Sequence, residues 1–349
     1  MDTRDTPEQA ELRRSARRLA RDLGPSTVAD LDDVARRTRL GDAVRDAGWL
    51  ELRGDTEDAA PVAGGVEAAI VADALGGAVA DVAFAGPVLA ADLARRGAVV
   101  DPDPAVVAFS AALIDTAVLA DGTTASALYA VDGDETANTA YVLSPEGCGY
   151  RLATVRVEPA PHANIGSDLT RAVRMVPTRS TLQVMNDQRR LLTDDDLAAW
   201  TALGLAITSA DLVGVMRGVL DMTVAYAAQR SQFGVPVGSF QAVQHLLAEA
   251  RCLMEGSFSV ALHAAWTVDN LAPDDARSAG RVAKAYCTRA ARTVCETAVQ
   301  VHGGVGNTWE CMAHVYMRRA LLSSQWFGDD GVQLGALGRE RLGIDNGLS

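Results

Sequence analysis

A glycine turn near the C-terminus has the strongest potential for ligand binding in this sequence. Small and apolar residues recur at helical spacing as far as Val301, and Gly303 and Gly304 then end the helix. Gly306 keeps the following backbone bare, so N–H groups of such a turn can donate to a phosphate or to a polar edge of a cofactor. An ordinary helix cap explains the same glycines, and a short glycine pattern does not separate the two interpretations.

Two motifs, well separated in the chain, extend this pattern. The first begins at Tyr226 and reads Tyr-Ala-Ala-Gln-Arg-Ser-Gln-Phe-Gly-Val-Pro-Val-Gly-Ser-Phe-Gln-Ala-Val-Gln-His. The second begins at Gln300 and reads Gln-Val-His-Gly-Gly-Val-Gly-Asn-Thr-Trp-Glu, with His-Val-Tyr-Met-Arg-Arg following from His314. In this order and separation they resemble the arginine-x-x-phenylalanine-glycine motif and the C-terminal signature of acyl-CoA dehydrogenases. The resemblance is specific from about residue 200 to 330 and looser elsewhere.

The resemblance implies a reaction, a cofactor and an arrangement of subunits. The reaction is α,β-desaturation of an acyl-CoA thioester, in which a carboxylate takes the α-proton and FAD accepts the β-hydride. In this fold, the arginine motif and the glutamine–glycine–glycine turn of one subunit contact the adenine and pyrophosphate end of the FAD that a neighbour holds. The residues implied for this contact are Arg230, Gln232, Phe233, Phe240, Gln241, Gln300, Val301, His302, Gly303 and Gly304.

Arg230 has the central role in this implied contact. A guanidinium is a fixed charge with fork geometry, so the resemblance makes Arg230 the clamp on the FAD phosphates. A helix-end ion pair is the alternative interpretation of this arginine. Retention of the whole set as structural scaffolding is the alternative interpretation of the two motifs.

The glutamate that serves most of this family as catalytic base is missing. Relatives carry it in one of two places: before a glycine that follows the C-terminal arginine helix, or early in the first bundle helix. Alignment through the arginines at 318–319 puts Phe327 at the first place, and alignment back from Arg230 puts Gly204 at the second. Neither residue can remove a proton, so we predict no catalytic residue in this chain. We also predict no metal site.

Other polar residues near these positions have simpler interpretations. Asp329 and Asp330 are close to the first place, but an acid-rich stretch of this kind favours a solvated turn. Glu310 follows the glycine turn at an expected helix start, so capping is the favoured role. His245 and His302 fall inside the motifs and have no partner that the sequence identifies.

The chain ahead of the motifs predicts a helical region and then a small β region. Residues 6–98 have helical patterns, beginning with a capping box at Thr6 and Gln9. Short strands are predicted at 105–109, 127–131, 140–143, 151–157 and 171–176. The motifs with which relatives hold the flavin ring are missing here. The run at 166–168 (Gly-Ser-Asp) lies too late in the chain and is interpreted as a turn, so the β region is predicted to be truncated.

The C-terminal region predicts a bundle. Thr193 and the acids at 194–196 open a helix that extends to Ala228, and further helices are expected from 239 past 266, over 278–301 and over 310–324. The predicted fold class is mainly α with a small β domain, similar to acyl-CoA dehydrogenases. Its expected parts are an N-terminal helical domain at 1–100, a truncated β domain at 101–190 and a four-helix bundle domain at 191–349.

Composition limits the classes of partner. A chain of 349 residues with 48% hydrophobic and 22% charged residues is long and apolar enough for a large core. A net charge of -13 argues against nucleic acid as the main partner. Five cysteines without a Cys-x-x-Cys pair predict reduced, mostly buried thiols and a cytoplasmic protein. No apolar run of about 18 residues stands out, which predicts no membrane span.

Three functional hypotheses remain. The first is a non-catalytic subunit that completes the FAD site of a paralogous sister chain, as in the α2β2 heterotetramers of actinobacterial sterol side-chain (steroid) degradation. The second is a self-sufficient homotetrameric dehydrogenase with a displaced base, for which Asp329 is the first candidate. The third is a non-enzymatic helical scaffold. Under the first two hypotheses the protein is a flavoprotein oxidoreductase of lipid metabolism with an acyl-CoA as its candidate substrate. A dimer of dimers is the expected assembly.

Overall fold

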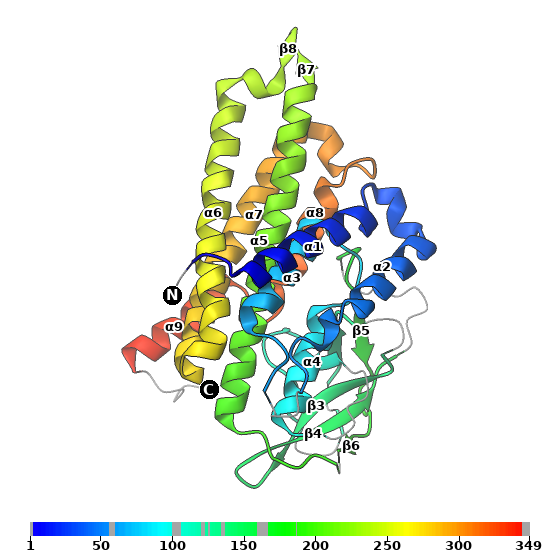
Figure 1. Cartoon of the computed structure of the whole chain (residues 1–349), viewed down its shortest axis with the longest axis vertical. Coiled ribbons are helices and arrows are strands. Elements are labelled where there is room, and N and C mark those ends of the chain that lie inside the picture. The colour runs from blue at the N-terminus through cyan, green and yellow to red at the C-terminus, as the bar shows by residue number, and fades with distance from the viewer. Residues whose placement is uncertain are drawn as a thin grey trace.

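The computed structural model describes residues 3–55, 60–99, 106–119, 123–124, 126–133, 137–158, 167–185 and 187–343. Long helices from the C-terminal half run along the long axis, and a small sheet lies beside their lower half (Figure 1). This arrangement confirms the predicted fold class, mainly α with a small β region. Ala105 and Gly166, which belong to predicted segments, lie outside the described residues.

Helices make up the described N-terminal part. They are α1 (Pro7–Leu23), η1 (Val28–Asp32), α2 (Val34–Asp46), η2 (Trp49–Glu51), α3 (Gly65–Gly77) and α4 (Ala85–Arg96), where η marks a 3-10 helix. The predicted capping box is confirmed, because the Gln9 N–H donates to Thr6 Oγ1 at 3.2 Å and the Thr6 N–H donates to Gln9 Oε1 at 3.0 Å. α3 is buried along most of its length and packs against the first bundle helix, which connects this region to the bundle.

The sheet is mixed and has the strand order β5-β2-β1-β3-β4-β6. Its strands are β1 (Val106–Phe109), β2 (Leu128–Val131), β3 (Thr139–Glu146), β4 (Gly149–Arg156), β5 (Val173–Val176) and β6 (Gln183–Val184). β1 and β3 are parallel, and the other neighbours are antiparallel. The five predicted strands are confirmed with shifted ends. β6 was missed because its two residues are exposed and too short to show an alternating pattern.

The C-terminal part contains more helices than the sequence predicts. They are α5 (Asp194–Gln229), α6 (Gln241–Asn270), α7 (Pro273–His302), η4 (Gly303–Asn307), α8 (Ala313–Gln325) and α9 (Asp330–Leu342). The predicted helix start at Thr193 is confirmed, and the structure adds a capping box there, with the Asp196 N–H donating to Thr193 Oγ1 at 3.2 Å. The prediction missed α9 altogether. It also began α7 too late, because Pro273 at the first position starts that helix.

The expected helix start at Glu310 is wrong. α8 begins at Ala313 with Met312 as its N-cap, and Glu310 lies exposed in the preceding turn.

The structure agrees with the prediction of reduced, mostly buried thiols. All five cysteines are free; Cys287, Cys295 and Cys311 are buried, whereas Cys148 and Cys252 are exposed.

α5 is the central helix of the bundle. By length and composition alone it is apolar enough to cross a membrane, but 89% of its most apolar stretch is buried inside the fold. It packs against α3, α6, α7 and α8, so it serves as a core helix.

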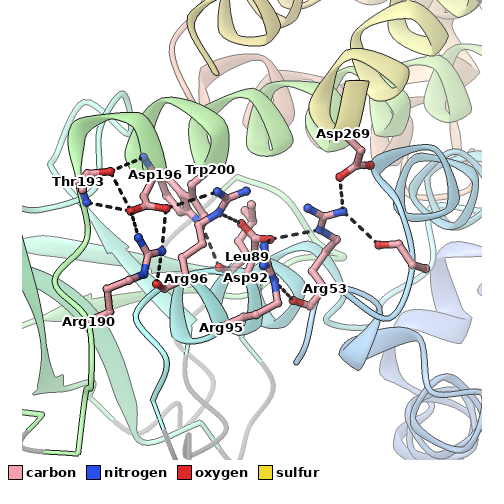
Figure 2. Close-up of polar contacts among 11 residues, drawn as sticks. Arg53, Leu89, Asp92, Arg95, Arg96, Arg190, Thr193, Asp196, Trp200 and Asp269 are labelled. Atoms are coloured by element: carbon pink, nitrogen blue, oxygen red, sulfur yellow. Dashed lines mark hydrogen bonds and ion pairs between the residues drawn. The ribbon is translucent and has the colours of Figure 1, made fainter. Parts of the chain in front are cut away.

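A buried carboxylate joins the N-terminal helices to the bundle (Figure 2). Asp92 of α4 is fully buried and pairs with Arg53 at 3.2 Å and with Arg96 at 2.6 Å. Arg53 also donates to Asp269, at the end of α6, at 2.9 Å. Burial alone would raise the pKa of Asp92, but Arg96, Arg53 and Arg95 outweigh it and lower that pKa. The α4 helix is therefore held to α6 through charge rather than by apolar packing alone.

A second buried carboxylate joins α5 to the sheet and to α8. Asp211 is fully buried and accepts from Arg171 at 3.0 Å, from Arg319 at 2.8 Å and from the Ser323 hydroxyl at 2.6 Å. Arg171 precedes β5 and Arg319 belongs to α8. Burial would raise the pKa of Asp211, but Arg171 and Arg319 outweigh it and lower that pKa to about 2.

Replacing Asp211 with asparagine should destabilise the chain strongly, because it leaves two buried guanidinium groups without their shared counter-charge. We expect a loss of about 3–5 kcal/mol in the free energy of unfolding, measured by denaturant titration. The control is Asp330→Asn, which breaks a pair with the largely exposed Arg289 and should cost about 0–1 kcal/mol. Equal losses for the two variants would contradict this assignment.

Lys284 predicts a pH-dependent stability. Its Nζ is buried and donates to the Ser323 carbonyl, and burial lowers the pKa of Lys284 from 10.5 to about 7. Between these values the unfolded chain binds a proton here that the folded chain does not, so stability rises with pH across this window. Lys284→Met should remove this part of the slope. Denaturant titrations from neutral pH to the high-pH end of this window compare the two proteins, and parallel slopes would contradict the prediction.

Candidate functional site

The two sequence motifs lie at the same end of the bundle. α5 and α7 both run antiparallel to α6, so their C-termini point the same way, toward the top of Figure 1. Arg230 caps α5 and Gly303 caps α7. The rings of Tyr226 and His302 stack between these helix ends, with centroids 4.3 Å apart and planes at 24°. The structure therefore brings the arginine motif and the glycine turn together.

Arg230 presents an exposed side chain from the end of α5. Its N–H donates to the Tyr226 carbonyl at 2.8 Å, and its own carbonyl accepts from the Val237 N–H at 2.8 Å. These two bonds fix the backbone where the helix stops. Among the residues that the structure describes, no carboxylate forms an ion pair with Arg230. The alternative of a helix-end ion pair is thus not supported there, and the guanidinium is available to an external anion.

A short hairpin follows Arg230 and projects beyond the bundle (Figure 1). It consists of β7 (Ser231–Gln232) and β8 (Val235–Pro236), with Phe233 and Gly234 at the tip. The φ angles at the tip are +54° and +80°, as in the tight turns that suit hairpins. A phenylalanine rarely adopts such a φ, and Phe233 is 94% exposed. Its ring meets Phe240, which begins α6, edge to face at 6.3 Å.

The strained backbone and the exposed ring of Phe233 indicate a contact with another molecule. Backbone strain of this kind concentrates at functional sites, and an exposed apolar group normally marks an interface. Gln232 and Gln241 are exposed beside the two phenylalanines. The sequence pattern missed β7 and β8, since two-residue strands carry no periodicity.

The glycine turn is open on its outer side. Gly303 has a φ of +66°, a conformation that favours glycine. A Cβ atom built at Gly303 or at Gly304 would meet nothing within 4 Å, so the backbone faces free space. Gln300 is exposed next to it and Val301 is half-buried. This bare, exposed backbone fits the predicted contact with a ligand.

His302 is placed differently from the rest of the predicted set. It is buried against Tyr226, and its Nδ1 lies 2.8 Å from the Ala298 carbonyl. A carbonyl only accepts, so Nδ1 carries the proton in this contact. The ring therefore faces the inside of the bundle. The sequence pattern did not single out Tyr226 as a functional residue, although its spacing of one helical turn before Arg230 was visible.

The two places expected for a catalytic glutamate meet in the interior. A Cβ atom on Gly204 would lie 2.1 Å from Cζ of Phe327, so the phenylalanine ring occupies the space above the glycine. The ring packs against Phe109 at 5.2 Å and Trp200 at 5.3 Å, and Trp326 completes the cluster. The Phe327 N–H donates to the Leu113 carbonyl at 2.7 Å. An apolar aromatic cluster thus fills the region where the resemblance places the glutamate of relatives.

The acids near this cluster have structural roles. Asp329 is the N-cap of α9, where its Oδ1 accepts from the Val332 N–H at 2.9 Å, and Asp330 pairs with Arg289 at 2.8 Å. The predicted solvated turn is therefore wrong, because these residues start a helix that the sequence analysis missed. Asp168 is buried and accepts from the Thr170 N–H at 2.8 Å, and burial raises its pKa. His245 is exposed on α6.

An open cleft of about 290 Å³ lies between the sheet and α8. It is lined by Ala111, Leu113, Tyr129, Ser167, Val173, Leu321, Leu322 and Gln325. No carboxylate belongs to this lining in the described part of the chain. No cluster of three or more potential metal ligands occurs among the described residues.

The chain is similar in sequence to known proteins. Residues 202–342 match the profile of the family described as acyl-CoA dehydrogenase, C-terminal domain. Acyl-CoA dehydrogenase FadE34 of Mycobacterium tuberculosis is 35% identical over 200 residues, which are 55% of this chain and 26% of that protein. The chain thus spans about a quarter of the length of this curated relative. In its C-terminal helical region the chain is therefore similar to acyl-CoA dehydrogenases.

Solved structures extend the likeness of the fold to the whole chain. The ChsE4–ChsE5 complex from Mycobacterium tuberculosis matches with a TM-score of 0.75 and 23% identity, covering 99% of this chain and 100% of that chain. The Tcur3481–Tcur3483 steroid ACAD, as a G363A variant, matches with a TM-score of 0.74 and 23% identity, covering 96% and 98%. At this identity the likeness concerns the fold.

The contact between Gly204 and Phe327 can be tested by adding one methyl group. Gly204→Ala should destabilise the chain by about 1–3 kcal/mol, because the new Cβ overlaps the ring. Adding Phe327→Leu to Gly204→Ala should recover part of that loss, whereas Phe327→Leu alone should not stabilise the chain. Denaturant midpoints measure all three. A Gly204→Ala protein as stable as the parent would show that the ring does not fill this space.

Proposed function

We propose that this chain is the non-catalytic subunit of a heteromeric acyl-CoA dehydrogenase and completes the FAD site of a paralogous sister chain. The contact between Gly204 and Phe327 carries the proposal, because an aromatic ring fills the place where a base would act. The exposed motif residues at the other end of the bundle support the second half of the proposal. In this proposal the chain lacks the catalytic base and retains the surface that contacts a neighbouring subunit.

The exposed end of the bundle fits the phosphate end of FAD. Arg230 offers a charged fork that pairs with no carboxylate among the described residues, and Gly303 and Gly304 offer bare backbone. Gln232, Phe233, Phe240, Gln241 and Gln300 supply amides and apolar rings beside them. FAD, when bound in the sister chain, would supply the acceptor for the β-hydride. The residues of this chain would hold and orient its phosphate end, and the sister chain would contribute the base.

The assembly we propose is a dimer of dimers that pairs this chain with a sister subunit. Heteromeric relatives in fold support it, namely the ChsE4–ChsE5 complex and the Tcur3481–Tcur3483 steroid ACAD. The second name also makes a steroid-derived acyl-CoA the substrate class we favour for the complex. We place the three domains at 1–100, 101–190 and 191–349, and the protein in the cytoplasm.

Co-expression with neighbouring paralogues is the direct test. The lone chain should purify without flavin colour, and the complex with its sister should carry FAD and desaturate an acyl-CoA. Flavin and full activity in the lone chain would support the self-sufficient homotetramer instead. Absence of flavin from every co-expressed complex would support the non-enzymatic scaffold.

Arg230 gives the sharpest single-residue test. A charge-assisted bond to a phosphate contributes about 1.5–3 kcal/mol, so Arg230→Ala should weaken FAD retention in the complex by roughly tenfold to a hundredfold. Arg230→Lys should restore only part of it, because an ammonium lacks the fork. The lone Arg230→Ala chain should unfold at the same temperature as the parent, because the Arg230 side chain makes no ion pair among the described residues.

A matched control removes an exposed arginine at a distance from the site. Arg45 of α2 pairs only with the exposed Asp42 among the described residues, and Arg45→Ala should leave both FAD retention and the melting temperature unchanged. Unchanged FAD retention in Arg230→Ala together with a lower melting temperature would show a structural role and refute the assignment.

A further inference from the structure

The end of α5 and the end of α7 are connected through one pair of rings. The Tyr226 and His302 rings stack at 4.3 Å, and the Tyr226 hydroxyl donates to the His302 carbonyl at 3.4 Å. His302 is only 6% exposed, and the contact of its Nδ1 with the Ala298 carbonyl fixes the orientation of its ring. The stack is therefore a defined contact within the fold and not a chance meeting of surface side chains.

The backbone of each of the two residues is connected to a residue that faces outward. The Tyr226 carbonyl accepts from the Arg230 N–H at 2.8 Å, so the position of Tyr226 sets where the arginine leaves the helix. His302 immediately precedes Gly303, whose N–H donates back into the last turn of α7. A continuous path of contacts thus runs from Arg230 through Tyr226 and His302 to the glycine turn.

We propose that Tyr226 and His302 are a positioning pair that holds Arg230 and the Gly303–Gly304 turn in one fixed arrangement. The physical reason is that two helix ends drift independently unless a contact near their ends couples them. A phosphate that bonds to both must otherwise order them on binding, which weakens affinity. The motif alone would imply that His302 touches the cofactor. In this proposal His302 acts through its neighbours instead.

This inference rests on the proposed function for its consequence, but the coupling itself belongs to the lone chain. Amide hydrogen exchange of the lone chain measures it. The N–H groups of Arg230 and Val237 report on the arginine segment, because both take part in bonds that involve Arg230. His302 lies on the other helix, so an effect of His302→Ala on these two amides that a histidine variant elsewhere does not share comes through the contact between helices.

We expect His302→Ala to speed exchange at Arg230 and Val237 by about two- to tenfold, the range that an aromatic pair contributes. Tyr226→Ala should do the same, and the double variant should show no further increase, because each single change already removes the stack. Tyr226→Phe and His302→Phe keep a stacked ring and should stay near the parent. Exchange that rises only around residue 302, or effects that multiply in the double variant, would overturn the pairing.

A second histidine stack provides the matched control. His263 lies 6.2 Å from Trp266, with planes at 20°, on α6. His263→Ala should leave exchange at Arg230 and Val237 unchanged. An increase equal to that of His302→Ala would mean that loss of any histidine loosens the bundle, and it would overturn the pairing.

FAD retention in the co-expressed complex then tests the consequence. His302→Ala should weaken it by about two- to tenfold, and His302→Phe should restore it. If His302→Ala leaves retention unchanged while Arg230→Ala lowers it, the pair has no role at the cofactor and this inference fails. If Arg230→Ala also leaves retention unchanged, the proposed function fails, and the exchange data still decide the coupling.

Discussion

The buried carboxylate of Asp211 is the constraint on which the arrangement of this chain depends. A charge in the middle of an otherwise apolar helix is costly unless partners reach it. Those partners come from other layers: Arg171 from the segment before β5 and Arg319 from α8. Arg171 also lies 3.4 Å from Asp132, whose carboxylate accepts N–H groups at the start of α4. One connected set of charges therefore fixes helices, sheet and bundle relative to each other.

The same framework explains why the interior and the exposed end of the bundle differ. Held against β1 and α5, the segment after α8 turns at Phe327 and places its ring over Gly204. Glycine is required at 204 because any side chain would overlap that ring. The exposed end has no such filling at Gly303 and Gly304, which face open space. The aromatic filling inside and the exposed cation outside are thus two separate features, and the proposed non-catalytic subunit requires both.

Sequence patterns predicted features that depend on neighbours in the chain. The capping box at Thr6, the helix start at Thr193 and the five strands have local signals, and the structure bears them out. α9 was missed because Asp329 and Asp330 suggested a solvated turn when considered without the helix that follows. The Gly204–Phe327 contact joins residues far apart in the chain, so alignment found both positions but not their meeting. Tyr226 was missed for the same reason, since its partner His302 lies on another helix.

An exposed arginine on an acidic chain makes only half of a phosphate site. The net charge of -13 repels anions at long range, and salt screens such fields beyond about 10 Å. In water a single exposed charge pair contributes about 0–1 kcal/mol, too little to retain a dinucleotide. The same contact strengthens when a second surface excludes water from it. Under the proposed function, Arg230 and the glycine turn would therefore hold a phosphate tightly only where a sister subunit covers them.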